Sequence, residues 1–301
     1  MKQIYLLILL SSLLLICHSQ NDLIDILIVD GFSNHNWKQT SELTKNILEE
    51  TGLFKVSVST FPEKNDSLQK IWNPEFNNYD VVIQNSNNIK DKSVRWPKAI
   101  EEQLESYVNS GGGLYILHSA NNSFNHWQEY NKMIGLGWRK KDSGIAIEID
   151  SLKNIIRIPV GEGRNTYHGP KTSLIIKKFG NHAINSDFPN EWFTPHTELY
   201  KYPRGSAENV TVISYAQDTA TLRYWPVEWV VTYGKGRVYN SSMGHLMHNE
   251  VYPDRFRCIG FQTCMIRATE WLATGKCTYP LPDNFPNGNS FSLKEIDNKQ
   301  Y

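Results

Sequence analysis

The feature that most constrains the fold is the segment from Ile24 to Val29, in which every residue except Asp25 is apolar. It ends at Asp30-Gly31, and a polar loop follows. A short segment that is apolar at nearly every position, rather than at every second one, is typical of a strand buried on both faces of a parallel sheet. Such a strand needs helices on both sides of the sheet, so the sequence predicts an α/β fold.

The residues that follow alternate between helical and strand patterns. A helix is expected up to Glu50, because Leu43, Ile47 and Leu48 recur at helical spacing and Gly52 can end the helix. Further strands are expected at 54–60, 79–83 and 114–117, and an amphipathic helix at 97–109. This alternation predicts a flavodoxin-like, mainly parallel sheet flanked by helices.

The second half of the chain has more β pattern. Strands are expected at 145–149, 155–158, 174–178, 210–216, 227–233 and 237–240, and a final helix at 255–273. No linker-like stretch interrupts residues 22–275, so this range is predicted to be one domain. Residues 280–301 are rich in Pro, Asn and Gly and are expected to form a loosely ordered tail.

Residues 1–19 have the pattern of a secretory signal peptide. Lys2 is followed by an apolar run over residues 4–16, and small residues at Cys17 and Ser19 suit cleavage before Gln20. Acylation of Cys17 is the alternative, and the bulky Ile16 before it disfavours that chemistry. We therefore expect an exported protein, periplasmic or secreted, with no transmembrane helix in the mature chain.

The charge balance limits the partners. The chain has 31 Lys and Arg residues and 31 Asp and Glu residues, so its formal net charge is zero and a nucleic-acid partner is not expected.

The triple glycine Gly111–Gly113 lies between a helix and the following strand, whereas a phosphate-binding loop lies between a strand and the following helix. We expect no nucleotide cofactor, and a small molecule or an oligosaccharide as the substrate. Association into a homo-oligomer is left open.

Polar residues follow several of the expected strands. Parallel strands end at one edge of the sheet, where ligands bind, so these residues are expected to share a site. Neutral imidazoles and a carboxylate suit a divalent metal such as zinc, and they equally suit acid–base catalysis without a metal. We assign catalysis, and metal binding if a metal is present, to His118, Glu198 and His245, and substrate binding to His35, Asn36, Trp37, Ser119, Trp127 and His168.

Tryptophans near the same loops suggest a sugar ligand. The chain has nine tryptophans, and sugars stack their apolar C–H faces on aromatic rings. Trp37 and Trp127 are predicted to lie at the mouth of the cleft.

Four motifs in order resemble the trehalose-utilisation, or ThuA-like, family over roughly residues 24–273. They are the stretch Gly111 to Ser119, Glu198-Leu199-Tyr200, Trp225-Pro226-Val227-Glu228-Trp229, and Gly234 to Tyr239 followed by Gly244-His245. The resemblance implies a fold similar to class I glutamine amidotransferases. It also implies a link to the breakdown of disaccharides or polysaccharides, where relatives are described as secreted glycosyl hydrolases.

Several functions fit these residues. The leading hypothesis is an enzyme that breaks down a disaccharide, a polysaccharide or a keto sugar, and the alternative is a non-catalytic sugar-binding module. Glu198 and Glu228 are the one carboxylate pair we can nominate for an ordinary glycosidase. A serine hydrolase built on Ser119 is disfavoured because the turn lacks flanking glycines. Glutamine hydrolysis by a thiolate is excluded, because no cysteine lies between Cys17 and Cys258.

Overall fold

A computed structural model describes residues 23–64 and 66–295, so the expected signal peptide at 1–19 lies outside the described residues. The elements run in the order β1 Ile24–Asp30, α1 Trp37–Glu49, β2 Phe54–Thr60, η1 Ser67–Lys70, η2 Phe76–Asn78, β3 Val81–Gln84, α2 Lys98–Asn109, β4 Gly113–Leu117, η3 His118–Asn122, α3 Gln128–Ile134, β5 Ile145–Ile149, β6 Ile155–Ile158, β7 Tyr167–His168, β8 Thr172–Lys178, η4 Ala183–Asn185, β9 Glu191–Thr197, β10 Tyr200–Lys201, β11 Arg204–Gly205, β12 Val210–Gln217, β13 Tyr224–Tyr233, β14 Gly236–Ser241, α4 Asp254–Arg257 and α5 Ile259–Thr274. Here η denotes a 3-10 helix.

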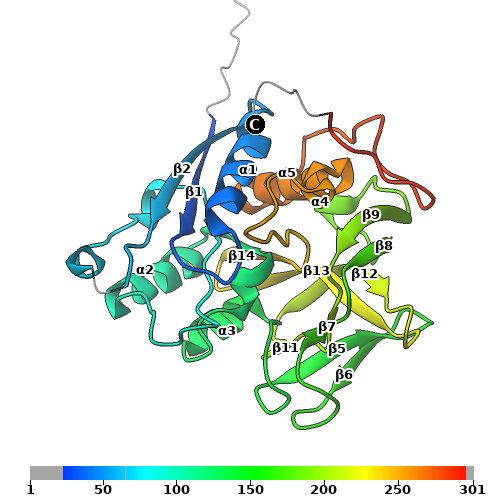
Figure 1. Ribbon diagram of the computed structural model, residues 1–301, viewed down its shortest axis with the longest axis horizontal. Helices are drawn as coiled ribbons and strands as arrows, with labels where there is room; N and C mark the ends of the chain where they lie inside the picture. Colours follow the sequence, from blue (N-terminus) through cyan, green and yellow to red (C-terminus); the bar gives the residue numbers. More distant parts are fainter. Residues whose placement is uncertain (1–22, 65, 296–301) are drawn as a thin grey trace, which may run out of the picture.

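One large sheet runs through the molecule in the order β2-β1-β3-β4-β14-β13-β12-β8-β9 (Figure 1). The pairs β1/β2, β1/β3, β3/β4 and β4/β14 are parallel, and this part has the flavodoxin-like strand order. The strands from β14 to β9 pair antiparallel, and β5, β6 and β11 are attached to this second half. The predicted α/β fold with extra β elements is therefore confirmed.

Strand β1 is covered on both faces, as its sequence predicted. Ile26 and Ile28 pack in a core that includes side chains of α1 and α5, and Leu27 and Val29 pack in a second core with side chains of α2 and α3. Because successive side chains of a strand point to opposite faces, one apolar segment serves both cores.

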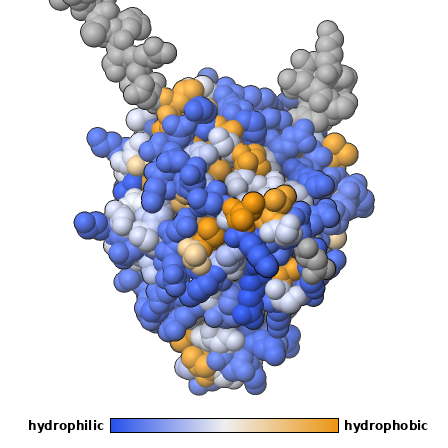
Figure 2. All heavy atoms as spheres, turned by 90° about the vertical axis from the view of Figure 1, so that its left-hand side faces the viewer, coloured by the Kyte–Doolittle hydropathy of each residue, from blue (hydrophilic) through white to orange (hydrophobic). Residues whose placement is uncertain are grey.

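Strand β2 is the edge strand beside β1. The molecular face that carries it is mostly hydrophilic, with apolar side chains in small groups (Figure 2). Val58, Leu68 and Ile71 are the exposed large apolar residues of β2 and of the segment around η1. Lys55 of β2 pairs with Asp25 at 3.3 Å, and such charges discourage edge-to-edge pairing with another sheet.

The segment after α5 differs from the loose tail expected for 280–301. Its described part packs against the second half of the protein: Asn287 O accepts a hydrogen bond from Phe193 N of β9, and Ser292 O accepts one from Ile259 N. The rings of Phe291 and Phe193 stack with their centroids 5.8 Å apart. These contacts hold Asn287 and Phe291 against Phe193 of β9, and Ser292 against the start of α5.

In residues 23–64 and 66–295, no helix is both long and apolar enough to cross a membrane. The three cysteines of this part, Cys258, Cys264 and Cys277, carry free thiols, and Cys258 and Cys264 are buried.

Candidate functional site

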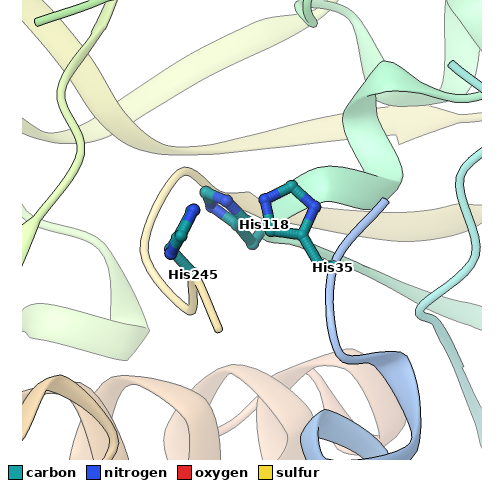
Figure 3. Close-up of side chains that lie close together, drawn as sticks. All are labelled: His35, His118 and His245. Atoms are coloured by element: carbon teal, nitrogen blue, oxygen red, sulfur yellow. The ribbon is translucent and has the colours of Figure 1, made fainter. Parts of the chain in front are cut away.

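Three histidines meet at the carboxyl edge of the parallel strands. His35 lies in the loop after β1, His118 directly follows β4, and His245 follows β14. Each side chain offers one nitrogen atom, and these three atoms lie within 4.8 Å of one another. Figure 3 shows the three rings gathered around one space, each from a different segment. The strands are parallel, so residues distant in sequence converge here.

The backbone after β4 holds His118 in an unusual conformation. Its φ is 42°, in the left-handed region that non-glycine residues rarely adopt, and such positions are concentrated at functional sites. His118 Nδ1 lies 2.6 Å from the carbonyl oxygen of Ser242, so it carries the proton and donates. Nε2 of His118 is therefore left with its lone pair, and it is buried without a hydrogen-bond partner among the described residues.

Gly244 makes room for this arrangement. Its φ is 104°, and a Cβ atom there would lie 3.1 Å from Leu117 Cδ1 and 3.5 Å from His118 Cβ. The glycine therefore allows the chain after β14 to pass close to His118 before it places His245.

Neighbouring groups also orient the other two rings. Asn34 Oδ1 lies 3.0 Å from His35 Nδ1, which leaves Nε2 of His35 for the cluster. The backbone carbonyl of His245 accepts a hydrogen bond from Arg255, whose guanidinium also pairs with Glu250. His245 Nδ1 is buried without a partner in the described part of the chain.

Glu198 joins the histidines at one side. Its Oε1 lies 3.1 Å from His245 Nε2 and 3.6 Å from His168 Nε2, and its Oε2 lies 3.8 Å from His118 Nε2. The carboxylate is 4 % exposed, and burial raises its pKa above the ordinary value. A carboxyl group with a raised pKa is suited to take up or deliver a proton in catalysis.

The imidazoles are held in the neutral form. Burial, followed by the charge of Lys171, lowers the pKa of His35 to about 4. Burial and then the neighbouring His35 lower the pKa of His245 to about 2 and that of His118 well below its ordinary value. Because only a neutral imidazole has a lone pair to give, the cluster is in the form that binds a metal ion.

A pocket of about 320 Å³ opens onto this cluster. Trp138 forms part of its wall, and the indole ring contacts His168 and Tyr200 with centroid distances of 5.5 and 5.2 Å. The lining residues are Asn34, His35, Ile89, Asn122, Trp138, His168, Lys171, Glu198, Tyr200, His245 and Met247.

The structure places the predicted metal and catalytic residues together and changes the role of His35. His118, Glu198 and His245 share one site. His35, which we assigned to substrate binding, is the third nitrogen donor of the cluster, whereas Glu198 lies beside it. His168 lines the pocket as expected.

Four other predicted substrate-binding residues lie elsewhere. Asn36 caps α1, accepting a hydrogen bond from Gln39 N, and Ser119 is buried in η3 and is not part of the pocket lining. Trp37 lines a different pocket, beside Asp30. Trp127 is 3 % exposed and donates to Glu105, so it belongs to the core.

Sequence reasoning missed part of the pocket. Lys171 and Tyr200 line it and are not among the predicted site residues. Asn34 and Asn122 also line it, and they lie in the segments after β1 and β4, where ligand-binding residues are expected. Tyr200 stands in the motif Glu198-Leu199-Tyr200, which could have revealed it.

Glu228 does not pair with Glu198 in the site. It is 3 % exposed, and its carboxylate accepts hydrogen bonds from Ser214 Oγ at 2.5 Å and from Tyr239. Burial raises its pKa, and Cys264 of α5 also contacts it. Its contacts are with the core, so Glu198 and Glu228 do not form a pair of carboxylates on either side of a sugar bond.

Comparison with known proteins agrees with this architecture. A family model described as trehalose utilisation, ThuA, matches residues 25–272. The chain belongs to the ThuA family. A crystal structure of a ThuA-like protein from Parabacteroides merdae is 28% identical, with a TM-score of 0.82, and the match covers 91% of this chain and 100% of that one.

A more distant ThuA-like protein, from Bacteroides uniformis, is 16% identical with a TM-score of 0.55, and the match covers 84% of this ThuA chain and 94% of that one. At this identity the likeness concerns the fold alone. Among curated proteins, none matches the chain.

Proposed function

We propose that this ThuA-family protein is an exported carbohydrate-processing enzyme whose site holds a divalent metal ion, zinc in the first instance, on His35, His118 and His245. The observation that carries the proposal is the convergence of three buried nitrogen atoms within 4.8 Å. Three histidine ligands with one open position are typical of catalytic zinc sites. The pocket lies on the open side of the cluster.

The unpartnered nitrogen atoms support this assignment over a purely structural role. A histidine that only caps a strand would be expected to satisfy its buried nitrogen atoms with hydrogen bonds. His118 Nε2 and His245 Nδ1 have none within the described ranges. A bound cation would use the lone pair of His118 Nε2 without requiring the imidazole to be protonated.

The protein's own groups have separate tasks in this proposal. A bound zinc ion would polarise a substrate oxygen. Glu198 takes up or delivers the proton, since its oxygens face the histidines and the pocket and its pKa is raised. Asn34 and Asn122 offer hydrogen bonds to sugar hydroxyls, and Trp138 offers an aromatic face. One proton-transferring group beside a Lewis acid suits isomerisation or cleavage of an oxidised sugar, including a keto sugar.

Activity on disaccharides and on 3-keto sugars, with and without a chelator, tests the proposal. We expect that the chelator abolishes turnover and that added zinc restores it. The substitution Glu198→Gln should lower the turnover rate about 10²–10⁴-fold. Glu162→Gln, at an exposed carboxylate away from the pocket, is the matched control. Turnover that survives both the chelator and Glu198→Gln would contradict the proposal.

The second candidate is a non-catalytic sugar-binding module, which Trp138 in the pocket wall favours. In that case sugars would bind, no product would form, and Glu198→Gln would change affinity alone. Product analysis on the same samples separates the two functions.

Export is part of the proposal and has its own test. The mass of the protein recovered from outside the cytoplasm should correspond to a chain that starts at Gln20. A membrane-bound form acylated on Cys17 would contradict free secretion.

A further inference from the structure

We infer that the substrate is a sugar acid, an oxidised sugar bearing a carboxylate, and that Lys171 binds this carboxylate at the rim of the pocket. The inference rests on the proposed function, because it names the substrate class of the same pocket.

Lys171 lines the pocket and is exposed to solvent. Its ammonium group makes no ion pair or hydrogen bond with any residue in the described ranges. Lys201 offers a contrast, because its ammonium is engaged by Asp218 at 2.7 Å. The cation of Lys171 is therefore available to a ligand.

Lys171 and the histidine cluster border the same pocket. His35, His245 and Glu198 line it together with Lys171. A ligand in this pocket would therefore lie close both to the ammonium group of Lys171 and to the histidines.

A metal ion at the cluster would give the pocket a net positive charge. Among the lining residues Glu198 is the single carboxylate and Lys171 the single lysine or arginine, so these two charges balance while the clustered imidazoles are neutral. A divalent ion on the histidines would add two positive charges that no further lining carboxylate offsets. A neutral sugar would leave this charge uncompensated, whereas a sugar carboxylate would balance part of it.

A matched pair of ligands tests the inference. D-gluconate and D-glucitol differ in whether the first carbon is a carboxylate or a hydroxymethyl group, and calorimetry on the zinc-loaded protein measures both affinities. We expect D-gluconate to bind about tenfold more tightly than D-glucitol. Lys171→Gln should remove this preference, and Lys171→Arg should retain most of it.

Lys141→Gln is the matched control, since Lys141 is an exposed lysine that does not line the pocket. Equal affinities of the wild type for the two ligands, or an unchanged preference in Lys171→Gln, would overturn the inference. The zinc content of each sample is measured in parallel. A protein that fails to retain zinc contradicts the proposed function, while the preference for D-gluconate and its dependence on Lys171 decide the inference separately.

Discussion

His118 and His245 lie at the carboxyl ends of neighbouring parallel strands, with their ring centroids 5.2 Å apart and their planes at 79°. The register Ser241 to Leu117 between β14 and β4 brings the two segments together. Because β1 belongs to the same parallel set, its following loop can add His35. The site is thus a direct consequence of the strand order.

The contact between Gly244 and His118 gives a first prediction. Gly244→Ala should lower the free energy of unfolding by about 2 kcal/mol, because alanine is strained at a φ of 104° and its Cβ would lie only 3.1 Å from Leu117 Cδ1. Urea denaturation measures the loss. Gly52→Ala is the control, since Gly52 has a φ of 70° with nothing within 4 Å of the added Cβ. Equal losses in both variants would show that the packing around His118 does not require Gly244.

The buried carboxyl of Glu228 gives a pH-dependent prediction. Burial raises its pKa above 4.5, so protonation favours the folded state, and its contribution to stability is present below 4.5 and is lost as pH rises through the folded-state pKa. Tyr115, Tyr239 and Cys264 are the titratable groups around it, and burial raises the pKa of each. They therefore stay protonated in this range. Glu228→Gln remains neutral at every pH.

Urea denaturation of the wild type and Glu228→Gln at about pH 4 and about pH 7 tests this account. The variant should gain stability relative to the wild type as pH rises between the two values. A difference that stays constant, or that moves in favour of the wild type, would contradict the assignment.

Trp138 gives a prediction about binding. Trp138→Ala should weaken the binding of D-gluconate by about 1–2 kcal/mol, because the ring forms part of the pocket wall beside His168 and Tyr200. Trp37→Ala should leave the affinity unchanged, since Trp37 lines a separate pocket. Calorimetry measures the affinity of both variants for D-gluconate. A loss of affinity in Trp37→Ala alone would contradict this prediction and would indicate that Trp37 stacks on the sugar.

The parallel half of the fold and the convergence of His118, Glu198 and His245 could be predicted from the sequence. The apolar segment of β1 identifies a strand covered on both faces. The pattern also reveals β4, which His118 directly follows, and β14, which ends at Ser241 shortly before His245. The rule that parallel strands end at one edge then places these histidines together.

Other parts depend on tertiary contacts that the pattern does not encode. Helix α3 is short and is not predicted from the sequence. Trp127 is its N-cap residue, and the indole ring lies 5.3 Å from the ring of Tyr130 in the core rather than at the mouth of the cleft. Strand β9 contains Pro195, which argues against a strand unless it lies at an edge. Lys171 reaches the pocket from an irregular segment before β8, where no periodicity could indicate its position.

The measurement that most directly tests the central claim is the zinc content of purified protein after incubation with zinc and desalting, compared between the wild type and His118→Gln. We predict about one zinc ion per wild-type chain and at least a tenfold lower affinity in His118→Gln, because that variant loses one of three ligands. His126→Gln, a histidine that pairs with Glu101 outside the pocket, should retain the metal. A wild-type protein that retains no zinc, or a His118→Gln variant that retains as much as the wild type, would contradict the account.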